Sequence, residues 1–542
     1  MSTPPLASGP DGPEALRPLL ETVLDALAAG RWARGGPLPA GGPRRVAAHV
    51  ADVLGEVLAD DGDPDALRAL VQALAEGAAD PADPLCAAHL HCPPLAVAVA
   101  ADLAVSALNP SLDSWDQAPA ASALEAEVTR ALAHEIGLAD ALVTTGGTES
   151  NQLALLLARE AHGGSVQLIC GAGAHHSLPR AAWLLGLPDP VVVPTPNGLL
   201  DPAALHEALT MLPGPLLVAA TAGTTDAGLI DPIPEIAGLC TAHGARLHID
   251  AAYGGGLAFS DRHREKLAGL ETAHTVTLDL HKLGWQPVAA GLLAVARPHE
   301  LAVLHQRADY LNADDDTEAG LPDLLDRSLR TTRRPDILKI AVTLKTLGRS
   351  GLGALVDEVC ARARAFAALV QDHPGFELYD RPVISTVLFR PVEADDATVA
   401  AVRRRLLHEG RAVLGRARLD GRLWFKATLL NPHTRPDELA QLLALVEEAI
   451  REEPTPEDPG PEEPTPGDPD PGQPGSEQPA PGKRASEQPA SRKRASEQPA
   501  SRKRASEQSA PEKQAPEEPD PEQSAPGLPP SEESTPEGTT PR

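Results

Sequence analysis

The sequence predicts an α/β fold with a mostly parallel sheet, preceded by helices and followed by a smaller α+β region. Three observations predict it. Short apolar segments alternate with helical patterns through the middle of the chain, as in parallel strands joined by crossover helices. Helical periodicity fills the N-terminal part. Near residue 453 the composition changes abruptly to a proline-rich segment.

These patterns divide the 542 residues into four regions. We expect an N-terminal helical segment at 1–85, a large α/β domain at 86–345, a small C-terminal domain at 346–452 and a disordered tail at 453–542. In the first region the helical periodicity covers 15–29, 45–59 and 64–78.

The large region carries the alternating pattern. Its apolar segments are short and bounded by turn residues, which is typical of buried strands. The strands are expected at 141–144, 166–170, 191–194, 216–221, 246–249, 275–278 and 290–294, and the clearest helices at 149–162, 178–185 and 233–243. The small region mixes helices at 352–372 and 397–408 with strands at 383–389 and 423–429.

The tail contains 22 of the 56 prolines and no aromatic residue. Its ten-residue repeat, Lys-Arg-Ala-Ser-Glu-Gln, begins at Lys483, Lys493 and Lys503. Such a segment buries too little apolar surface to offset the entropy lost on ordering, so we expect disorder. The repeat could serve as a kinase site or a docking arm, but a low-complexity repeat without a dedicated role is the simpler interpretation.

Charge and composition exclude several classes of function. The net charge of −29 argues against a nucleic-acid binder, which needs a basic face. No apolar run approaches the ~20 residues of a membrane-spanning helix, and the N-terminus has no secretory pattern, so we expect a cytoplasmic protein. The five cysteines are widely spaced and indicate free thiols rather than disulfides or a metal site. A nucleophilic cysteine is the alternative, but no His-containing signature surrounds any of them.

Three segments carry groups suited to chemistry. The first, Thr-Thr-Gly-Gly-Thr-Glu-Ser-Asn at 144–151, joins a strand to a helix. Gly147 lets the backbone approach an anion, the helix start offers free N–H groups, and Thr148 adds a hydroxyl. The segment predicts a phosphate site, although by itself a Gly-Gly turn that only caps a helix fits equally well.

The other two segments place an acid and an amine at strand ends. Asp250 lies at the carboxyl end of a predicted strand, where α/β proteins bind ligands, and could pair with a protonated ring nitrogen. Lys282 follows another strand and His281, and could form a Schiff base. Taken alone, Asp250 could cap a turn and Lys282 could be solvated.

In this order, the three segments resemble the signature of fold-type I pyridoxal 5′-phosphate (PLP) enzymes, and more specifically the group II PLP-dependent amino acid decarboxylases. Four further stretches are similar to that family, and the resemblance extends from about residue 89 to 431. These stretches are 89–91, 109–117, the His-containing segment 173–181 and the Gly-Thr-Thr segment 220–228.

The resemblance implies a role for each matching residue. Lys282 binds the cofactor as a Schiff base, Asp250 pairs with its ring nitrogen, and His175 stacks on the ring. His176 is the alternative to His175, but the alignment of Ser177 and Ala181 favours His175. Gly147, Thr148 and His281 hold the phosphate, Thr225 and Ala252 line the ring, and His89, His91, Trp115 and Tyr310 lie on the substrate side. The resemblance also implies a homodimer whose substrate is a small molecule, an amino acid, with the N-terminal helices packed on the partner.

One departure from the family bears on the substrate. In the loop at 310–327, Leu324 stands where related decarboxylases carry the tyrosine taken to protonate Cα. This weakens the case for an aromatic substrate and leaves the proton donor open. Segments 309–312 and 328–334 look closer to diaminobutyrate and siderophore-type lysine decarboxylases. We therefore expect a diamino acid substrate and a role in siderophore or polyamine biosynthesis.

The sequence leaves several alternatives open. The acidic residues of the loop at 314–318 could attract a cationic substrate or could simply be solvated. The enzymatic rivals are an aromatic amino acid decarboxylase, a PLP aminotransferase and an aldehyde-forming PLP enzyme. The non-enzymatic rival is a scaffold protein that uses the repeat tail.

Overall fold

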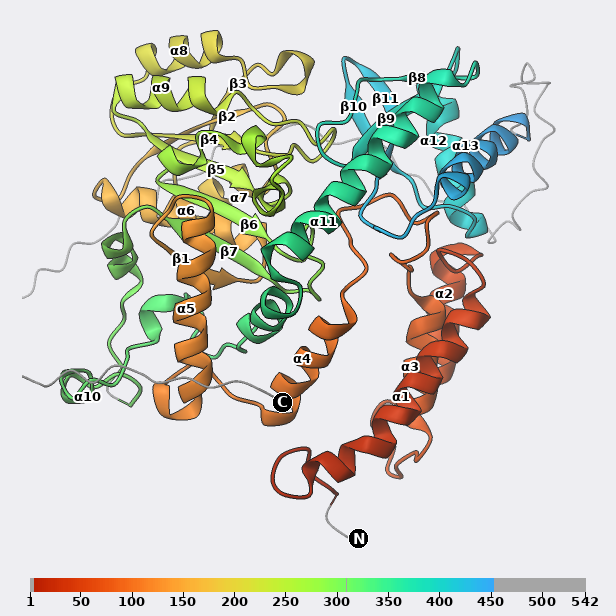
Figure 1. Ribbon diagram of the computed structural model, residues 1–542, viewed down its shortest axis with the longest axis horizontal. Coiled ribbons are helices and arrows are strands. Elements are labelled where there is room, and N and C mark those ends of the chain that lie inside the picture. The colour runs from red at the N-terminus through yellow and green to blue at the C-terminus, as the bar shows by residue number, and fades with distance from the viewer. Residues whose placement is uncertain (1–3, 309, 453–542) are drawn as a thin grey trace, which may run out of the picture. The chain divides into compact units, whose positions relative to one another are not determined.

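A computed structural model describes residues 4–308 and 310–452 of the chain (Figure 1). Within these residues the strands form two sheets, of seven and four strands. The predicted tail at 453–542 and its repeat lie outside the described residues. Where the structure is described, no helix combines the length and apolar character needed to cross a bilayer.

The seven-stranded sheet is mostly parallel, as predicted. Its order is β1-β7-β6-β5-β4-β2-β3, and β7 runs antiparallel to β1 and β6 while the other neighbouring pairs are parallel. Every residue of β4, β5, β6 and β7 is buried, and β4 and β7 accordingly form nearly continuous apolar runs, whereas β5 and β6 alternate apolar with polar residues. The strands are β1 Asp140–Thr144, β2 Gln167–Gly171, β3 Val191–Val193, β4 Leu216–Thr221, β5 Arg246–Ala251, β6 Thr275–Asp279 and β7 Gly291–Val295.

Helices connect these strands and extend beyond the sheet. The expected helices at 149–162, 178–185 and 233–243 correspond to α6, α7 and α9 within two residues. α4 and α5 were not predicted because alanines on several faces blur their periodicity. The helices up to α9 are α1 Gly12–Arg34, α2 Gly42–Leu54, α3 Ala66–Gly77, α4 Ala96–Leu108, α5 Pro119–Glu135, α6 Gly147–Ala161, α7 Ser177–Leu184, α8 Pro202–Met211 and α9 Ile233–His243.

The four-stranded sheet is antiparallel, in the order β10-β11-β9-β8, and has its own apolar core. α11 runs from beside the large sheet to this small one (Figure 1). Its helical geometry is interrupted at Gly348, where φ is 66°. The remaining elements are α10 Asp314–Glu318, α11 Ile337–Asp372, α12 Asp396–Glu409, α13 Pro436–Arg451, β8 Phe376–Leu378, β9 Thr386–Pro391, β10 Gly415–Leu419 and β11 Arg422–Thr428.

The domain boundaries stay predictions. The expected boundary between residues 345 and 346 falls inside α11, close to its break at Gly348. Since α11 contributes buried residues to the cores of both sheets, the helix belongs to both parts.

The parallel strands place chemically active residues at one edge of the large sheet. Thr221 of β4 lies beside Asp250 of β5, which lies beside Thr277 of β6. The carboxyl ends of β1 and β2 point the same way because they share this direction in the sheet. Residues that follow these strands therefore meet at one edge, although they are far apart in sequence.

Candidate active site

A cavity of about 310 Å³ lies at this edge of the sheet. Residues that follow β1, β2, β4, β5 and β6 all contribute to it. It is lined by Leu90, Thr145, Gly146, Gly147, Thr148, His175, Thr221, Gly223, Thr225, Asp250, Ala252, Tyr253, Asp279, His281, Lys282 and Val288. The cavity thus brings together all the cofactor-side residues expected from the sequence.

The turn between β1 and α6 forms one wall. Gly146 has φ of 150° and stands directly before α6, and no side chain among the described residues caps that helix. A Cβ on Gly147 would lie 3.0 Å from the Cβ of Ala252 and 3.3 Å from Oδ2 of Asp279. The glycines therefore keep open a space into which the first N–H groups of α6 point, a favourable place for an anion.

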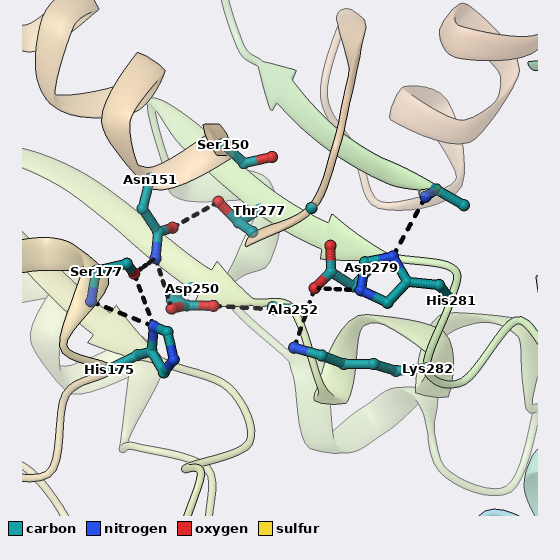
Figure 2. Close-up of polar contacts among 12 residues, drawn as sticks. Ser150, Asn151, His175, Ser177, Asp250, Ala252, Thr277, Asp279, His281 and Lys282 are labelled. Atoms are coloured by element: carbon teal, nitrogen blue, oxygen red, sulfur yellow. Dashed lines mark hydrogen bonds and ion pairs between the residues drawn. The ribbon is translucent and has the colours of Figure 1, made fainter. Parts of the chain in front are cut away.

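A series of hydrogen bonds runs from Asp250 to His175 (Figure 2). Asp250 is 5% exposed and accepts hydrogen bonds from the backbone N–H of Ala252 at 3.1 Å and from Nδ2 of Asn151 at 2.8 Å. Nδ2 of Asn151 also donates to Oγ of Ser177 at 2.8 Å. Oγ of Ser177 in turn lies 2.8 Å from Nδ1 of His175.

This chain fixes where the proton of His175 sits. A carboxylate only accepts, so Asn151 presents its NH₂ to Asp250 and Ser177. The hydroxyl of Ser177 accepts from Asn151 and has its own proton left for His175. Nδ1 of His175 also accepts from the backbone N–H of Ser177 at 3.3 Å, so the neutral ring carries its proton on Nε2. Burial lowers the pKa of His175, despite the opposing charge of Asp250, and so favours this neutral form.

The carbonyl end of Asn151 is equally well held. Its Oδ1 accepts from Oγ1 of Thr277 at 2.8 Å and lies 3.0 Å from Nε2 of His248. Nδ1 of His248 lies 2.9 Å from Oγ1 of Thr275. Asn151 and His248 are fully buried, and burial lowers the pKa of His248 to about 4, against the opposing effect of Asp250. All four hydrogen-bonding positions of Asn151 are thus used, which locks its orientation.

Lys282 and His281 both face Asp279 (Figure 2). Nζ of Lys282 lies 3.0 Å and Nε2 of His281 lies 3.4 Å from Oδ2 of Asp279. Nδ1 of His281 accepts from the backbone N–H of Ala290 at 3.2 Å, which leaves Nε2 as the protonated nitrogen. Burial opposes ionisation of Asp279, but the hydrogen bond from His281 and the charge of Lys282 outweigh it and lower the pKa of this carboxyl.

The sequence did not single out Asn151, Ser177, His248 or Asp279. All four stand within or beside the segments that were recognised, but a polar side chain near a motif does not reveal its direction. Only the sheet register shows that Asn151, on the first turns of α6, meets β5 and β6.

The residues expected on the substrate side do not line the cavity. His89 and His91 are exposed on either side of Leu90, which does line it. Trp115 lines a separate pocket together with Leu324, and Tyr310 is 82% exposed. Leu324 is 8% exposed and packs against Leu112 and Ala118. Their assignment to the substrate stays a prediction.

The cavity fits the cofactor that the sequence resemblance implies. The open glycine turn suits a phosphate, the buried Asp250 suits a protonated ring nitrogen, and Lys282 offers a primary amine. Oδ1 of Asp279 is buried without a hydrogen-bond partner among the described residues, which indicates that the site is completed by a group other than these side chains.

Comparison with known proteins agrees. Residues 61–392 match the family model described as the pyridoxal-dependent decarboxylase conserved domain. The L-2,4-diaminobutyrate decarboxylase of Rhizobium meliloti (strain 1021) is 42% identical over 388 residues, 68% of this chain and 78% of that protein. The enzyme of the same name from Acinetobacter baumannii is 33% identical over 399 residues, 66% of this chain and 78% of that protein.

A solved structure shows the same fold. The glutamate decarboxylase domain of the diaminobutyrate-pyruvate transaminase and L-2,4-diaminobutyrate decarboxylase from Vibrio parahaemolyticus superimposes with a TM-score of 0.73. It is 29% identical, and the match covers 82% of this chain and 98% of that one. These similarities confirm the predicted PLP cofactor and the predicted fold. The chain therefore belongs to the pyridoxal-dependent decarboxylase family, and its reaction is the PLP-dependent decarboxylation of an amino acid.

Proposed function

We propose that the substrate is a diamino acid, with L-2,4-diaminobutyrate as the first candidate and lysine as the second. The observation that carries this proposal is the 42% identity to the Rhizobium meliloti L-2,4-diaminobutyrate decarboxylase across 68% of the chain. The leucine at position 324 also argues against an aromatic substrate, as the sequence suggested. The diamine product would suit siderophore or polyamine biosynthesis.

In this proposal each residue expected to bind the cofactor has one task. Lys282 binds the cofactor covalently, and Asp250 holds the proton of the cofactor's ring nitrogen. The turn at Gly147 and Thr148 would hold the phosphate with its free N–H groups and a hydroxyl, and His281, whose ring lies beside Gly146, would flank it. Thr225 and Ala252 border the ring, and His175 lies over it. When bound, PLP supplies an electron sink for the bond that breaks.

The protein contributes position and charge. Asp250 is buried and doubly hydrogen-bonded, so its carboxylate stays fixed toward the cavity. The proton on Nε2 of His175 gives the cavity a neutral donor that can orient the substrate carboxylate. Such pre-set groups need no rearrangement when the substrate arrives.

Leu324 carries no proton to give, and its side chain packs among Leu112 and Ala118. The proton that returns to Cα must therefore come from a different group. Tyr310 stays a predicted substrate-side residue. Its side chain is exposed in the single chain.

A CO₂-release assay across substrates tests the proposal. We expect turnover of 2,4-diaminobutyrate or lysine, with 1,3-diaminopropane or cadaverine as the matching amine, and little turnover of tyrosine or tryptophan. A keto acid or aldehyde product would indicate a different PLP reaction. Preferential turnover of an aromatic amino acid would contradict the proposed substrate.

We also propose a homodimer in the cytoplasm. Apolar side chains on the N-terminal helices support the dimer: Leu24, Trp32 and Leu74 are 65%, 87% and 72% exposed. The five cysteines are free, and four of them are buried, which suits a reducing compartment. Light scattering should give twice the mass of the chain, and Trp32→Glu should shift the protein toward the monomer. A monomeric wild-type protein would contradict the dimer.

A further inference from the structure

Asp279 has no task in the reaction described so far, yet it lies closest to the reactive amine. It ends β6, three residues before Lys282, and its side chain is 3% exposed. Oδ2 lies 3.0 Å from Nζ of Lys282, whose side chain is 18% exposed. A carboxylate buried to this degree needs a charged partner, and in this structure Lys282 is such a partner.

The carboxylate is held firmly in place. Asp279 pairs with Gly291 of β7 in the centre of the sheet. His281 holds Oδ2 from a second direction at 3.4 Å. Side-chain atoms of Asp279 also pack toward Gly146 and Gly147, where an added Cβ would lie 3.6 Å from Oδ1 and 3.3 Å from Oδ2. The position that Nζ occupies here is therefore built into the sheet edge.

For decarboxylation, Lys282 must be released from the cofactor and must remain nearby as a free side chain while the substrate reacts. When the substrate amine enters, the bond that joins the cofactor to Lys282 passes to the substrate nitrogen. Two protons are transferred from the substrate ammonium to Nζ of Lys282. The lysine is therefore released as an ammonium, and the total charge is unchanged. A partly buried ammonium without a counter-ion would oppose this exchange.

We propose that Asp279 is a positioning residue that receives the ammonium of Lys282 after the substrate displaces it, and thereby favours the displacement. This inference rests on the proposed role of Lys282 but not on the identity of the amino acid. The neutral amide of asparagine has the same shape but offers no counter-charge. Asp279→Asn therefore isolates the charge of the carboxylate from its volume.

Displacement by methylamine provides a test that does not depend on the substrate. The full-length holoenzyme is equilibrated with increasing methylamine and reduced with borohydride. Mass spectrometry then gives the fraction of cofactor fixed to Lys282 and the fraction fixed to methylamine. For Asp279→Asn we expect half-displacement to need at least about tenfold more methylamine, because one partner of a mostly buried ion pair is gone.

The Lys282→Ala background separates this role from a structural one. In that background, methylamine joins the bound cofactor without releasing any lysine. Adding Asp279→Asn should then leave the methylamine concentration for half-reaction unchanged. Asp279→Ala, which removes the charge and leaves more room, serves as the second variant in both backgrounds if the asparagine variant folds poorly.

Two results would overturn the proposal. One is unchanged methylamine displacement in both Asp279 variants with Lys282 present. The other is an equal loss with Lys282 present and in the Lys282→Ala background, which would mean that Asp279 only shapes the cavity. The methylamine experiment still tests the role of Asp279 if no diamino acid is turned over. Methylamine lacks the carboxylate and the side chain that define the substrate, so its reaction does not depend on substrate identity.

Discussion

Nδ2 of Asn151 donates to Oδ2 of Asp250 at 2.8 Å, and the same nitrogen donates to Ser177 at 2.8 Å. This one amide connects the acid at the end of β5 to the histidine that follows β2. The charge of Asp250 helps to orient this amide, and the hydrogen bonds that follow, together with the backbone N–H of Ser177, set the tautomer of His175. The two residues proposed to contact the cofactor ring, one at its nitrogen and one over its face, are thus connected by one buried side chain.

Replacing Asn151 with alanine should therefore affect both Asp250 and His175, the two residues that this series of hydrogen bonds connects. Asp250 would lose one of its two hydrogen bonds, and His248 and Thr277 would lose their shared acceptor. Leaving such groups unsatisfied costs about 1–3 kcal/mol each. We expect weaker PLP binding, by about tenfold or more, and lower thermal stability, measured by cofactor titration and calorimetry.

Asn431→Ala is the matched control. Asn431 donates one hydrogen bond to the backbone of Ala82 and does not line the cavity. It should leave PLP affinity unchanged. Equal PLP affinity in Asn151→Ala and Asn431→Ala would show that the buried chain does not support the cofactor site.

Gly147→Ala tests the anion site. The new Cβ would lie 3.0 Å from that of Ala252 and 3.3 Å from the Asp279 carboxylate, so the turn must shift. We expect PLP affinity to fall by about tenfold, in line with the cost of overpacking. Gly238→Ala is the control, because Gly238 lies within α9 and a Cβ there would meet nothing within 4 Å. Unchanged PLP affinity in Gly147→Ala would contradict the placement of the phosphate.

His248 should make stability depend on pH. Its pKa is lowered from 6.5 to about 4 by burial, so the unfolded chain binds a proton at pH values where the folded chain does not. The stabilising effect of the neutral ring is therefore complete above pH 6.5 and is lost as the pH falls toward 4. At pH 5 the loss is about 2 kcal/mol.

Urea unfolding at pH 7 and pH 5 measures this effect. Between these pH values the wild type should lose about 2 kcal/mol more than His248→Gln, whose side chain does not titrate. Equal losses in the two proteins would show that His248 takes up its proton without unfolding.

Leu324→Tyr tests whether a tyrosine at position 324 can donate a proton to Cα. Leu324 packs in a small apolar cluster away from the cavity, so we expect no rise in kcat and a loss of about 1–3 kcal/mol from overpacking. Leu321→Tyr is the control, since Leu321 is 37% exposed and should tolerate the change within about 0.5 kcal/mol. An increased kcat in Leu324→Tyr would place this loop in the active site.

The sequence predicted the strands of the large sheet well because most of them are buried on both faces, and the short segments Leu216–Thr221 and Gly291–Val295 are nearly continuous apolar runs bounded by turn residues. It predicted Gly147, Asp250 and Lys282 because each lies at or just after the carboxyl end of a predicted strand. It gave no sign of α5, whose alanines hide its periodicity, or of the part of α11 that precedes Gly348.

The side-chain partners in the site were beyond sequence reasoning. Asn151 reaches Asp250 across 99 positions, and this contact depends on the register of β5 and β6 against α6. Asp279 was visible in the motif, but its pairing with Lys282 depends on how the turn after β6 folds back. The family pattern identified Leu324 as the residue at the position of the tyrosine in related decarboxylases. Only the structure shows that its side chain packs against Leu112 and Ala118.

The most direct test of this account is to find where the cofactor is attached. The resting holoenzyme is reduced with borohydride, digested and mapped by mass spectrometry. The account predicts a pyridoxyl group on Lys282, and Lys282→Ala should bind PLP without a reducible link to the chain. Attachment at any other lysine, or no bound PLP in cofactor-supplemented wild-type protein, would contradict it.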